Sequence, residues 1–138
     1  MSEDRLGLLL SSPYVKGMGV KLDHHGDELT AVMPYREALV GNPLIPALHG
    51  GAIGAFMEIT ASAALMAGSR LKAIPKPIDV AVDYLRPGRP SDVYARAVIT
   101  RQGSRVANVR VEAWQERRAA TIATLHGHFL VKPEDAEA

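Results

Sequence analysis

The sequence predicts an α+β domain in which a curved antiparallel sheet wraps one long central helix. Three observations point to this fold class. Residues 49–69 form one long helical pattern of little side-chain bulk, with six alanines between Ala52 and Ala67. Residues 78–131 are almost wholly β-formers that alternate along the chain. The length of 138 residues is close to that of one domain, so we expect a single domain over 1–138 with its core at 10–131.

Turn residues and apolar patterns set the expected elements in order. Gly26-Asp27, Gln102-Gly103-Ser104 and Glu116-Arg117-Arg118 mark short turns between strands. Two prolines in the loop 41–48 argue against regular structure there. The expected elements are a short helix over 5–10 that ends at Ser11-Ser12-Pro13, strands over 20–25 and 28–35, a helix over 49–69, and strands over 78–85, 93–101, 105–115 and 119–131.

The last strand, residues 119–131, is apolar on both faces, so we expect burial on both sides, at a subunit interface. His126 and His128 alternate on one face of it. With no carboxylate nearby in the sequence, they favour packing or interface roles over a metal site. The acidic tail, residues 134–138, is expected to be disordered.

Composition argues against several kinds of function. The 16 basic and 15 acidic side chains give a net charge of +1, which offers no reason to expect a nucleic-acid or membrane partner. The absence of cysteine excludes disulfides, thiol catalysis and thiolate metal sites. The acidic N-terminus lacks the features of a signal peptide, so a cytoplasmic location is expected. Glu58 interrupts the long apolar helix, which predicts a buried helix rather than a membrane span.

The motif that carries chemistry is Leu48-His49-Gly50-Gly51, followed by Glu58. Glycines at a helix start let a substrate approach the backbone closely, because no Cβ obstructs it. The first N–H groups of a helix have no internal partner and lie at the positive end of its dipole. They can therefore stabilise a carbonyl oxygen that becomes negative in a transition state, while Glu58 supplies a nucleophile or a general base.

Helix geometry places these two parts on different chains. Gly50 and Glu58 are eight residues apart, which is about 12 Å along a helix. A carboxylate cannot reach a carbonyl held at the start of its own helix across that gap. An antiparallel helix from a second subunit would bring Gly50 of one chain beside Glu58 of the other, so the motif predicts a site across a two-fold dimer interface.

A structural interpretation of the same residues stands beside this one. A Gly-Gly pair before a helix is often only a turn, and a single glutamate in a helix is usually a solvated surface residue. Glu58, however, lies in an otherwise uncharged segment from Gly50 to Ser69. An ionised group amid that much apolar surface costs several kcal/mol unless it is compensated, which favours a functional role.

Together with Asn42-Pro43, the motif Leu48-His49-Gly50-Gly51…Glu58 and the later Asp83-Tyr84-Leu85-Arg86-Pro87 resemble the hotdog thioesterases of the phenylacetic-acid-degradation (PaaI-like) branch. The resemblance covers about residues 10–131. It implies a helix wrapped by an antiparallel sheet, homodimers that pair into homotetramers, and hydrolysis of acyl-CoA without a metal or a cofactor.

The resemblance also assigns roles in the site. It places the attacking or water-activating carboxylate at Glu58 and the polarising amide at Gly50. Ser62, at i+4 from Glu58, would position water, although a helix serine is also commonly a back-bonded hydroxyl. Asn42 would reach the site from the partner subunit. Its spacing to His49 is one residue longer than the family pattern, so it alternatively serves only the turn before the proline; His49 would shape the loop.

The same resemblance suggests where CoA binds. Arginines suit its phosphates, although exposed arginines at strand ends are usually only solvated. The candidate substrate- and CoA-binding residues are Gly51, the strand end Arg86, Pro87, Gly88 and Arg89, and the hairpin tip Gly103, Ser104 and Arg105.

Two other functions and the acyl group stay open at this point. A hotdog hydratase or dehydratase would need a His-Phe-Pro-like segment, which the sequence lacks. A non-catalytic acyl-CoA sensor remains an alternative, although the chain has no room for a DNA-binding domain. An aryl or medium-chain acyl group is expected from the residues predicted to shape the pocket with the partner's loop: Leu44, Ile45, Phe56, Met57 and Ile59.

Overall fold

The computed structural model describes residues 2–68, 70–71 and 73–132. The predicted tail over 134–138 and the predicted helix end at Ser69 lie outside the described residues. The helices and strands are α1 (Ser2–Leu10), α2 (Pro13–Met18), β1 (Lys21–His25), β2 (Glu28–Met33), the short 3₁₀ helix η1 (Glu37–Leu39), β3 (Val40–Asn42), β4 (Ala47–Leu48), α3 (Gly50–Gly68), β5 (Lys76–Tyr84), β6 (Val93–Gln102), β7 (Val106–Trp114) and β8 (Ala123–Leu130).

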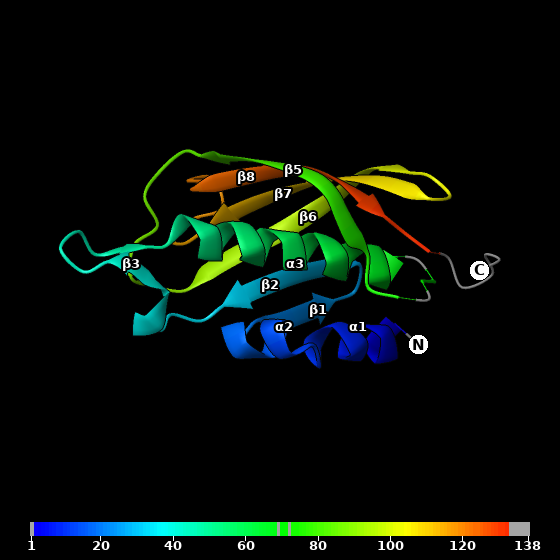
Figure 1. The fold of residues 1–138 in the computed structure, drawn as a ribbon, viewed down its shortest axis with the longest axis horizontal. Helices are drawn as coiled ribbons and strands as arrows, with labels where there is room; N and C mark the ends of the chain where they lie inside the picture. Colours follow the sequence, from blue (N-terminus) through cyan, green and yellow to red (C-terminus); the bar gives the residue numbers. More distant parts are fainter. Residues whose placement is uncertain (1, 69, 72, 133–138) are drawn as a thin grey trace.

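Six strands form one antiparallel sheet in the order β1-β2-β6-β7-β8-β5. The sheet curves around α3, with β5 arching over one side of the helix and β1 and β2 passing along the other (Figure 1). α1 and α2 lie beyond β1, and α1 also packs against α3. The predicted architecture, an antiparallel sheet wrapped around one long helix, is therefore confirmed.

The inner face of the sheet and the concealed faces of α3 form the core. Alternation decides which side chains enter it: in β7, Ala107, Val109, Val111 and Ala113 point inward and are almost fully buried. Phe56, like its neighbours in α3, is buried against the sheet. By length and composition α3 could cross a membrane, but more than half of it is buried inside the protein, as in a core helix.

Two local predictions were wrong, and one helix was not predicted. The first helix ends at Leu10, before Ser11-Ser12-Pro13 as predicted. Pro13 then begins α2, which was not expected, because a proline at the first helical position loses no hydrogen bond. The proline-containing loop 41–48 includes β3 and β4, which pair as a small hairpin because both prolines lie between the strands. The last strand is not buried on both faces: β8 starts only at Ala123, and its residues alternate between buried and exposed.

Candidate active site

The start of α3 leaves one backbone amide free. The carbonyl of His49 accepts hydrogen bonds from the N–H groups of Ala52 (3.0 Å) and Ile53 (3.3 Å). The N–H of Gly51 donates to Nδ1 of the His49 ring over 2.9 Å. Within the described residues the N–H of Gly50 has no acceptor. Of the first four amides of the helix, it is thus the one available to a substrate oxygen.

The His49 imidazole acts as a cap for this helix start. Because its Nδ1 accepts a hydrogen bond from Gly51, that nitrogen carries no proton in this arrangement. A Cβ on Gly51 would lie 2.9 Å from the ring, so only glycine allows this contact. The N–H of His49 itself donates to the carbonyl of Leu39 over 2.8 Å. These contacts agree with the loop-shaping role that the family resemblance implies for His49, and that role stays a prediction.

Glu58 and Ser62 share one face of α3 with the two glycines that precede them. Gly50, Gly54, Glu58 and Ser62 follow one another at four-residue intervals, and we call them the Gly50–Ser62 row. Glu58 is partly buried, and burial raises the pKa of its carboxyl above the usual value of 4.5. A carboxyl in such an environment is a better base and a poorer permanent charge than an exposed one.

Ser62 is not the back-bonded hydroxyl of this helix. That position belongs to Thr60, whose Oγ1 donates to the carbonyl of Phe56 over 2.8 Å. Ser62 is only 6% exposed, and its hydroxyl has no hydrogen-bond partner in the part of the chain that the structure describes. One turn from Glu58 and unengaged, it is free to bind a water molecule or a substrate oxygen.

Asn42 lies at the tip of the β3–β4 hairpin, where its Oδ1 accepts a hydrogen bond from the N–H of Leu44 over 3.0 Å. This contact is an Asx-turn, and it favours the turn role over the site role within one chain. Leu44 beside it is 90% exposed. The hairpin projects away from the body of the chain at the end of the molecule where α3 begins (Figure 1).

The residues predicted to shape one acyl pocket are not brought together. Phe56 and Met57 are fully buried in the core and Ile59 is nearly so, because they lie on the faces of α3 that turn away from Glu58. Leu44 and Ile45 are exposed on the hairpin. Within one chain, therefore, the helix residues of that prediction support the site from behind and do not line an open pocket.

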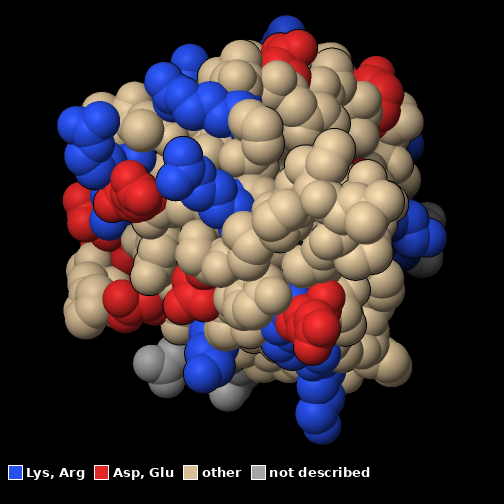
Figure 2. All heavy atoms as spheres, turned by 90° about the vertical axis from the view of Figure 1, so that its left-hand side faces the viewer, with Lys and Arg blue, Asp and Glu red and all other residues tan. Residues whose placement is uncertain are grey.

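The predicted strand-end residues after β5 line a cavity of about 300 Å³. Arg86 and Arg89 lie in its wall together with Ser91, Gln115 and Glu116. Figure 2 faces this end of the molecule and shows Lys and Arg side chains gathered beside an uncharged ridge. The cavity therefore offers two positive side chains and a hydroxyl to an anionic group, with one acidic side chain at its border.

Gln115 holds the backbone of this cavity in place. Its Oε1 accepts the N–H of Arg89 over 2.9 Å and its Nε2 donates to the carbonyl of Arg89 over 2.8 Å. The carbonyl of Gly88 accepts the N–H of Leu48 over 2.9 Å, just before the helix start. A Cβ on Gly88 would lie 2.8 Å from Ile53. The loop 86–91 is thus fastened to both the cavity wall and the beginning of α3.

Within one chain, the two predicted groups of CoA-binding residues lie at opposite ends of strand β6. The segment 86–89 precedes β6, whereas the hairpin tip 103–105 follows it. The ten residues of β6 separate them by roughly 30 Å at 3.3 Å per residue. Part of the positive charge of Arg86 is also engaged, since Nη1 donates to the carbonyl of Thr121 over 2.9 Å. One chain alone does not join both groups in one binding site.

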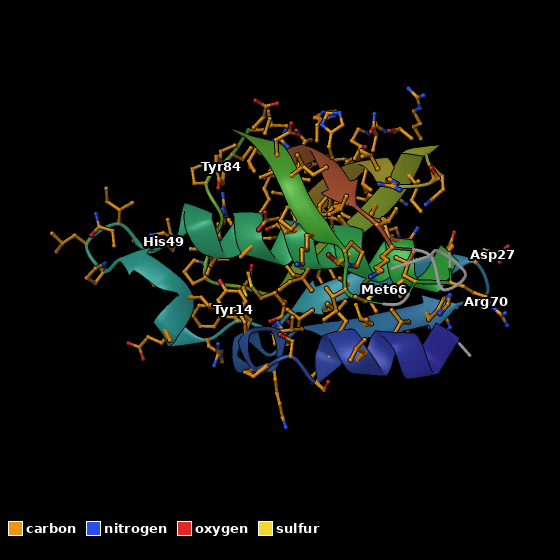
Figure 3. The ribbon with its side chains drawn as sticks, turned by 45° about the vertical axis from the view of Figure 1, so that its right-hand side comes forward. Tyr14, Asp27, His49, Met66, Arg70 and Tyr84 are labelled. Carbon is orange, nitrogen blue, oxygen red and sulfur yellow. The ribbon has the colours of Figure 1, made fainter. Side chains whose placement is uncertain are left out.

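Sequence reasoning missed two residues of this region as functional candidates. Tyr84 lies beside the first turn of α3, where its hydroxyl donates to the carbonyl of Gly50 over 2.6 Å (Figure 3). Gln115 forms the clamp on Arg89. The motif that contains Tyr84 marked it only as part of a family pattern, and no local signal marked Gln115.

One of the two histidines of β8, His128, has a side-chain partner that is distant in the sequence. His128 and Asp79 lie on neighbouring strands, with Nδ1 and Oδ1 2.6 Å apart. No carboxylate stands near His128 in the sequence, because Asp79 is 49 residues away. Both side chains are about half-exposed or more, and no group of three metal-ligating side chains is found among the described residues.

Comparisons with known proteins agree on the family and the fold. The profile of the Thioesterase superfamily matches residues 46–122, which include the helix start, Glu58 and the cavity loop. The medium/long-chain acyl-CoA thioesterase YigI of Escherichia coli K12 is 28% identical over 120 residues, covering 77% of each chain.

Two solved structures match nearly the whole chain. A Chromobacterium violaceum protein is 40% identical, with a TM-score of 0.72 over 97% of this chain and 94% of its own. The PaaI protein of the Escherichia coli phenylacetic acid degradation operon is 16% identical, with a TM-score of 0.79 over 94% and 92%. The predicted hotdog fold is thereby confirmed.

Proposed function

The chain belongs to the thioesterase superfamily, and on that premise we propose that it hydrolyses medium-chain acyl-CoA thioesters to the free acid and CoA. The observation that supports this most is the Gly50 amide, which stays free at a helix start two turns before a partly buried glutamate. The relative YigI is named as a medium/long-chain acyl-CoA thioesterase. A medium-chain acyl group is common to that name and to our expectation from the sequence.

In the proposed reaction Glu58 acts on a carbonyl held by Gly50 of the partner subunit. Its carboxylate takes a proton from a water molecule whose oxygen bonds to the thioester carbon, or its own oxygen forms that bond. The Gly50 N–H stabilises the negative charge on the carbonyl oxygen. The C–S bond then breaks, and the CoA sulfur leaves as a thiolate. With water as the nucleophile, the thiolate takes up the proton that Glu58 removed. With Glu58 as the nucleophile, the acyl group is left on Glu58 as an anhydride, which a second step hydrolyses: water gives the free acid, the Glu58 carboxylate is restored, and the proton that is released goes to the thiolate. Ser62 holds the attacking water.

The open edge of the sheet at β5 supports a dimer. Within the described residues β5 pairs with β8 alone, so its outer side carries unpaired backbone groups. Ile78 is 55% exposed and Leu85 58% exposed at this edge, which favours burial against a second chain. Pairing of β5 with its own copy about a two-fold axis reverses both β5 and α3. The two copies of α3 are then antiparallel, so the start of α3 in one chain lies toward the later turns of α3 in the other.

The same pairing would rejoin the two groups of CoA residues. The loop 86–91 follows the last residue of β5, Tyr84. The first residue, Lys76, is in register with Leu130, which pairs with Val106 beside the hairpin tip. In an antiparallel β5 pair, the end of one strand lies beside the start of the other. Arg86 and Arg89 of one chain would then face the partner's hairpin tip, and CoA would bind between them.

A panel of acyl-CoA substrates, assayed for release of free thiol, tests the proposal. Glu58→Ala should reduce kcat by more than about 1000-fold while CoA affinity and oligomeric state stay unchanged. Glu37→Ala, an exposed glutamate of η1, is the matched control and should behave as wild type. Turnover by Glu58→Ala at the wild-type rate would contradict the mechanism.

The panel also separates the alternatives. Preference for an aryl acyl-CoA would revise the acyl group and leave the reaction intact. Binding of acyl-CoA without thiol release, unchanged by Glu58→Gln, would indicate a sensor. An absorbance change on an enoyl or 3-hydroxyacyl thioester without free thiol would indicate a hydratase or dehydratase. Pairing into tetramers and a cytoplasmic location stay predictions.

A further inference from the structure

Tyr84 connects the edge strand β5 to the helix start. Its hydroxyl donates to the Gly50 carbonyl over 2.6 Å, which is short for an O–H···O hydrogen bond. The two residues are 34 positions apart in the chain. This contact therefore fixes the first turn of α3 against the sheet, which helix hydrogen bonds alone cannot do.

The Tyr84 side chain packs against two glycines of the Gly50–Ser62 row. A Cβ on Gly50 would lie 3.3 Å from Cζ of Tyr84, and a Cβ on Gly54 would lie 3.3 Å from its hydroxyl. Gly54 is one turn before Glu58 on the same face. The hydroxyl thus contacts the face of α3 that also carries Glu58, while Tyr84 as a residue is 53% exposed.

We infer that Tyr84 is a positioning residue, which holds the first turn of α3 so that the Gly50 N–H points at the thioester carbonyl oxygen. This rests on the proposed hydrolysis. The amide stabilises charge only while its direction is fixed, and displacement by about 1 Å can cost up to 100-fold in rate. The hydroxyl is one of three contacts that fix the turn, the others being the His49 ring and the His49 carbonyl.

Tyr84→Phe removes the hydroxyl and keeps the ring. It should lower kcat about 5- to 20-fold, less than loss of a direct oxyanion donor, and leave KM nearly unchanged. Tyr35→Phe is the matched control, because the structure shows no hydrogen bond from the Tyr35 hydroxyl within the described residues. A wild-type kcat for Tyr84→Phe overturns the inference alone. Absence of turnover by the wild-type protein on every acyl-CoA overturns the proposed function, and the inference with it.

A double-substitution cycle separates positioning from packing. Gly54→Ala introduces a Cβ against the hydroxyl, so it should also lower kcat. In the Tyr84→Phe background that Cβ has room, and Gly54→Ala should cost less than twofold. Independent, additive losses would show that the two residues do not act through one contact and would overturn the inference.

Inhibitor binding gives a readout that a purely structural role would not change. A CoA ketone, in which CH₂ replaces the thioester sulfur, keeps the carbonyl; the corresponding thioether of CoA lacks it. Tyr84→Phe should weaken the ketone about fivefold and the thioether not at all. Equal weakening of both, or of neither, overturns the inference. Melting curves and gel filtration of each variant establish that the folded oligomer is the species measured.

Discussion

The two edges of the six-stranded sheet are built differently. β1, at one edge, is short and polar: its sequence is Lys-Leu-Asp-His-His, and Asp23 pairs with His25 at 2.8 Å on the surface. β5, at the other edge, is nearly twice as long and presents Ile78 and Val80 to solvent, with Leu85 exposed directly after it. Short charged edges discourage pairing with another chain, whereas long apolar edges permit it. The fold is thus closed to association at β1 and open at β5.

The open edge is also the edge that carries the site. Tyr84 ends β5 and contacts the helix start, and the cavity loop follows directly. The edge at β1 lies beside α1 and α2, far from these groups (Figure 1). The groups that we propose for association and for chemistry therefore lie on one side of the chain. Substitutions at the two edges should therefore have very different effects.

The largest effect is expected from charging the open edge. Ile78→Lys with Ala81→Lys places two exposed lysines on β5, and those of two copies would repel each other across the two-fold axis. We expect dissociation to monomers by analytical ultracentrifugation and loss of thioesterase activity by more than about 100-fold. His24→Lys with His25→Lys, the same charges on β1, should leave both unchanged. A fully active dimer of the β5 variant would refute pairing through this edge.

A mixing experiment tests whether each site takes residues from two chains. Gly50→Pro removes the free N–H at a helix position that accepts proline, and it should be as inactive as Glu58→Ala. In mixed dimers one site keeps both residues and the other loses both. Random exchange makes half the dimers mixed, so activity should recover to about a quarter of wild type.

No recovery in exchanged dimers would mean that Gly50 and Glu58 act within one chain. Exchange itself is followed by a mass tag on one variant, so that absence of mixing is not mistaken for absence of recovery.

A smaller effect is expected when the pH is lowered, which should reduce kcat/KM. Burial raises the pKa of Glu58, and the proposed mechanism requires its ionised form. As the pH falls, kcat/KM should drop tenfold per unit, starting from a higher pH than for an ordinary glutamate. The test is the pH–rate profile on one acyl-CoA. A profile that stays flat down to the usual glutamate pKa would contradict it.

The same raised pKa has an opposite consequence for stability. The ionised carboxylate is disfavoured in the fold, a cost that is absent below the unfolded pKa and develops as the pH rises through the folded pKa. Glu58→Gln should therefore raise Tm by a few degrees at neutral pH and have little effect at about pH 4.

The smallest effect is expected at the closed edge. Asp23→Ala removes the side-chain contact with His25, in which both side chains are largely exposed. Such pairs contribute little, so the free energy of unfolding should change by no more than about 0.5 kcal/mol. Denaturant melts, gel filtration and thiol release should all match wild type. A marked loss of activity would show that the two edges are coupled.

Local sequence patterns predicted most helices and strands. They did not predict the contacts between residues that are distant in the sequence. The expected helix over 49–69 became α3, Gly50–Gly68, because its pattern is long and its start carries glycines. The strands followed from alternation. Nothing local placed β5 beside β8, since the order of strands is set by pairing across the whole chain.

The candidate site also contains residues that the sequence predicted and residues that it did not. Gly50 and Glu58 stand out within one helix, where spacing alone gives their separation. Tyr84 reaches Gly50 from 34 positions away and Gln115 reaches Arg89 from 26, so neither contact has a sequence signal. Asn42 was a site candidate through the family resemblance, with a turn role as the alternative, and its Oδ1 accepts the hydrogen bond of a turn from the N–H of Leu44.

The open β5 edge has a consequence for how activity depends on amount. If each site needs two chains, a solitary chain contributes no turnover, and the active species is governed by mass action. Below the dimer dissociation constant the observed rate would rise with the square of chain concentration, and above it linearly. A substrate that bridges both chains would itself favour assembly, so acyl-CoA would activate a dilute sample after a lag.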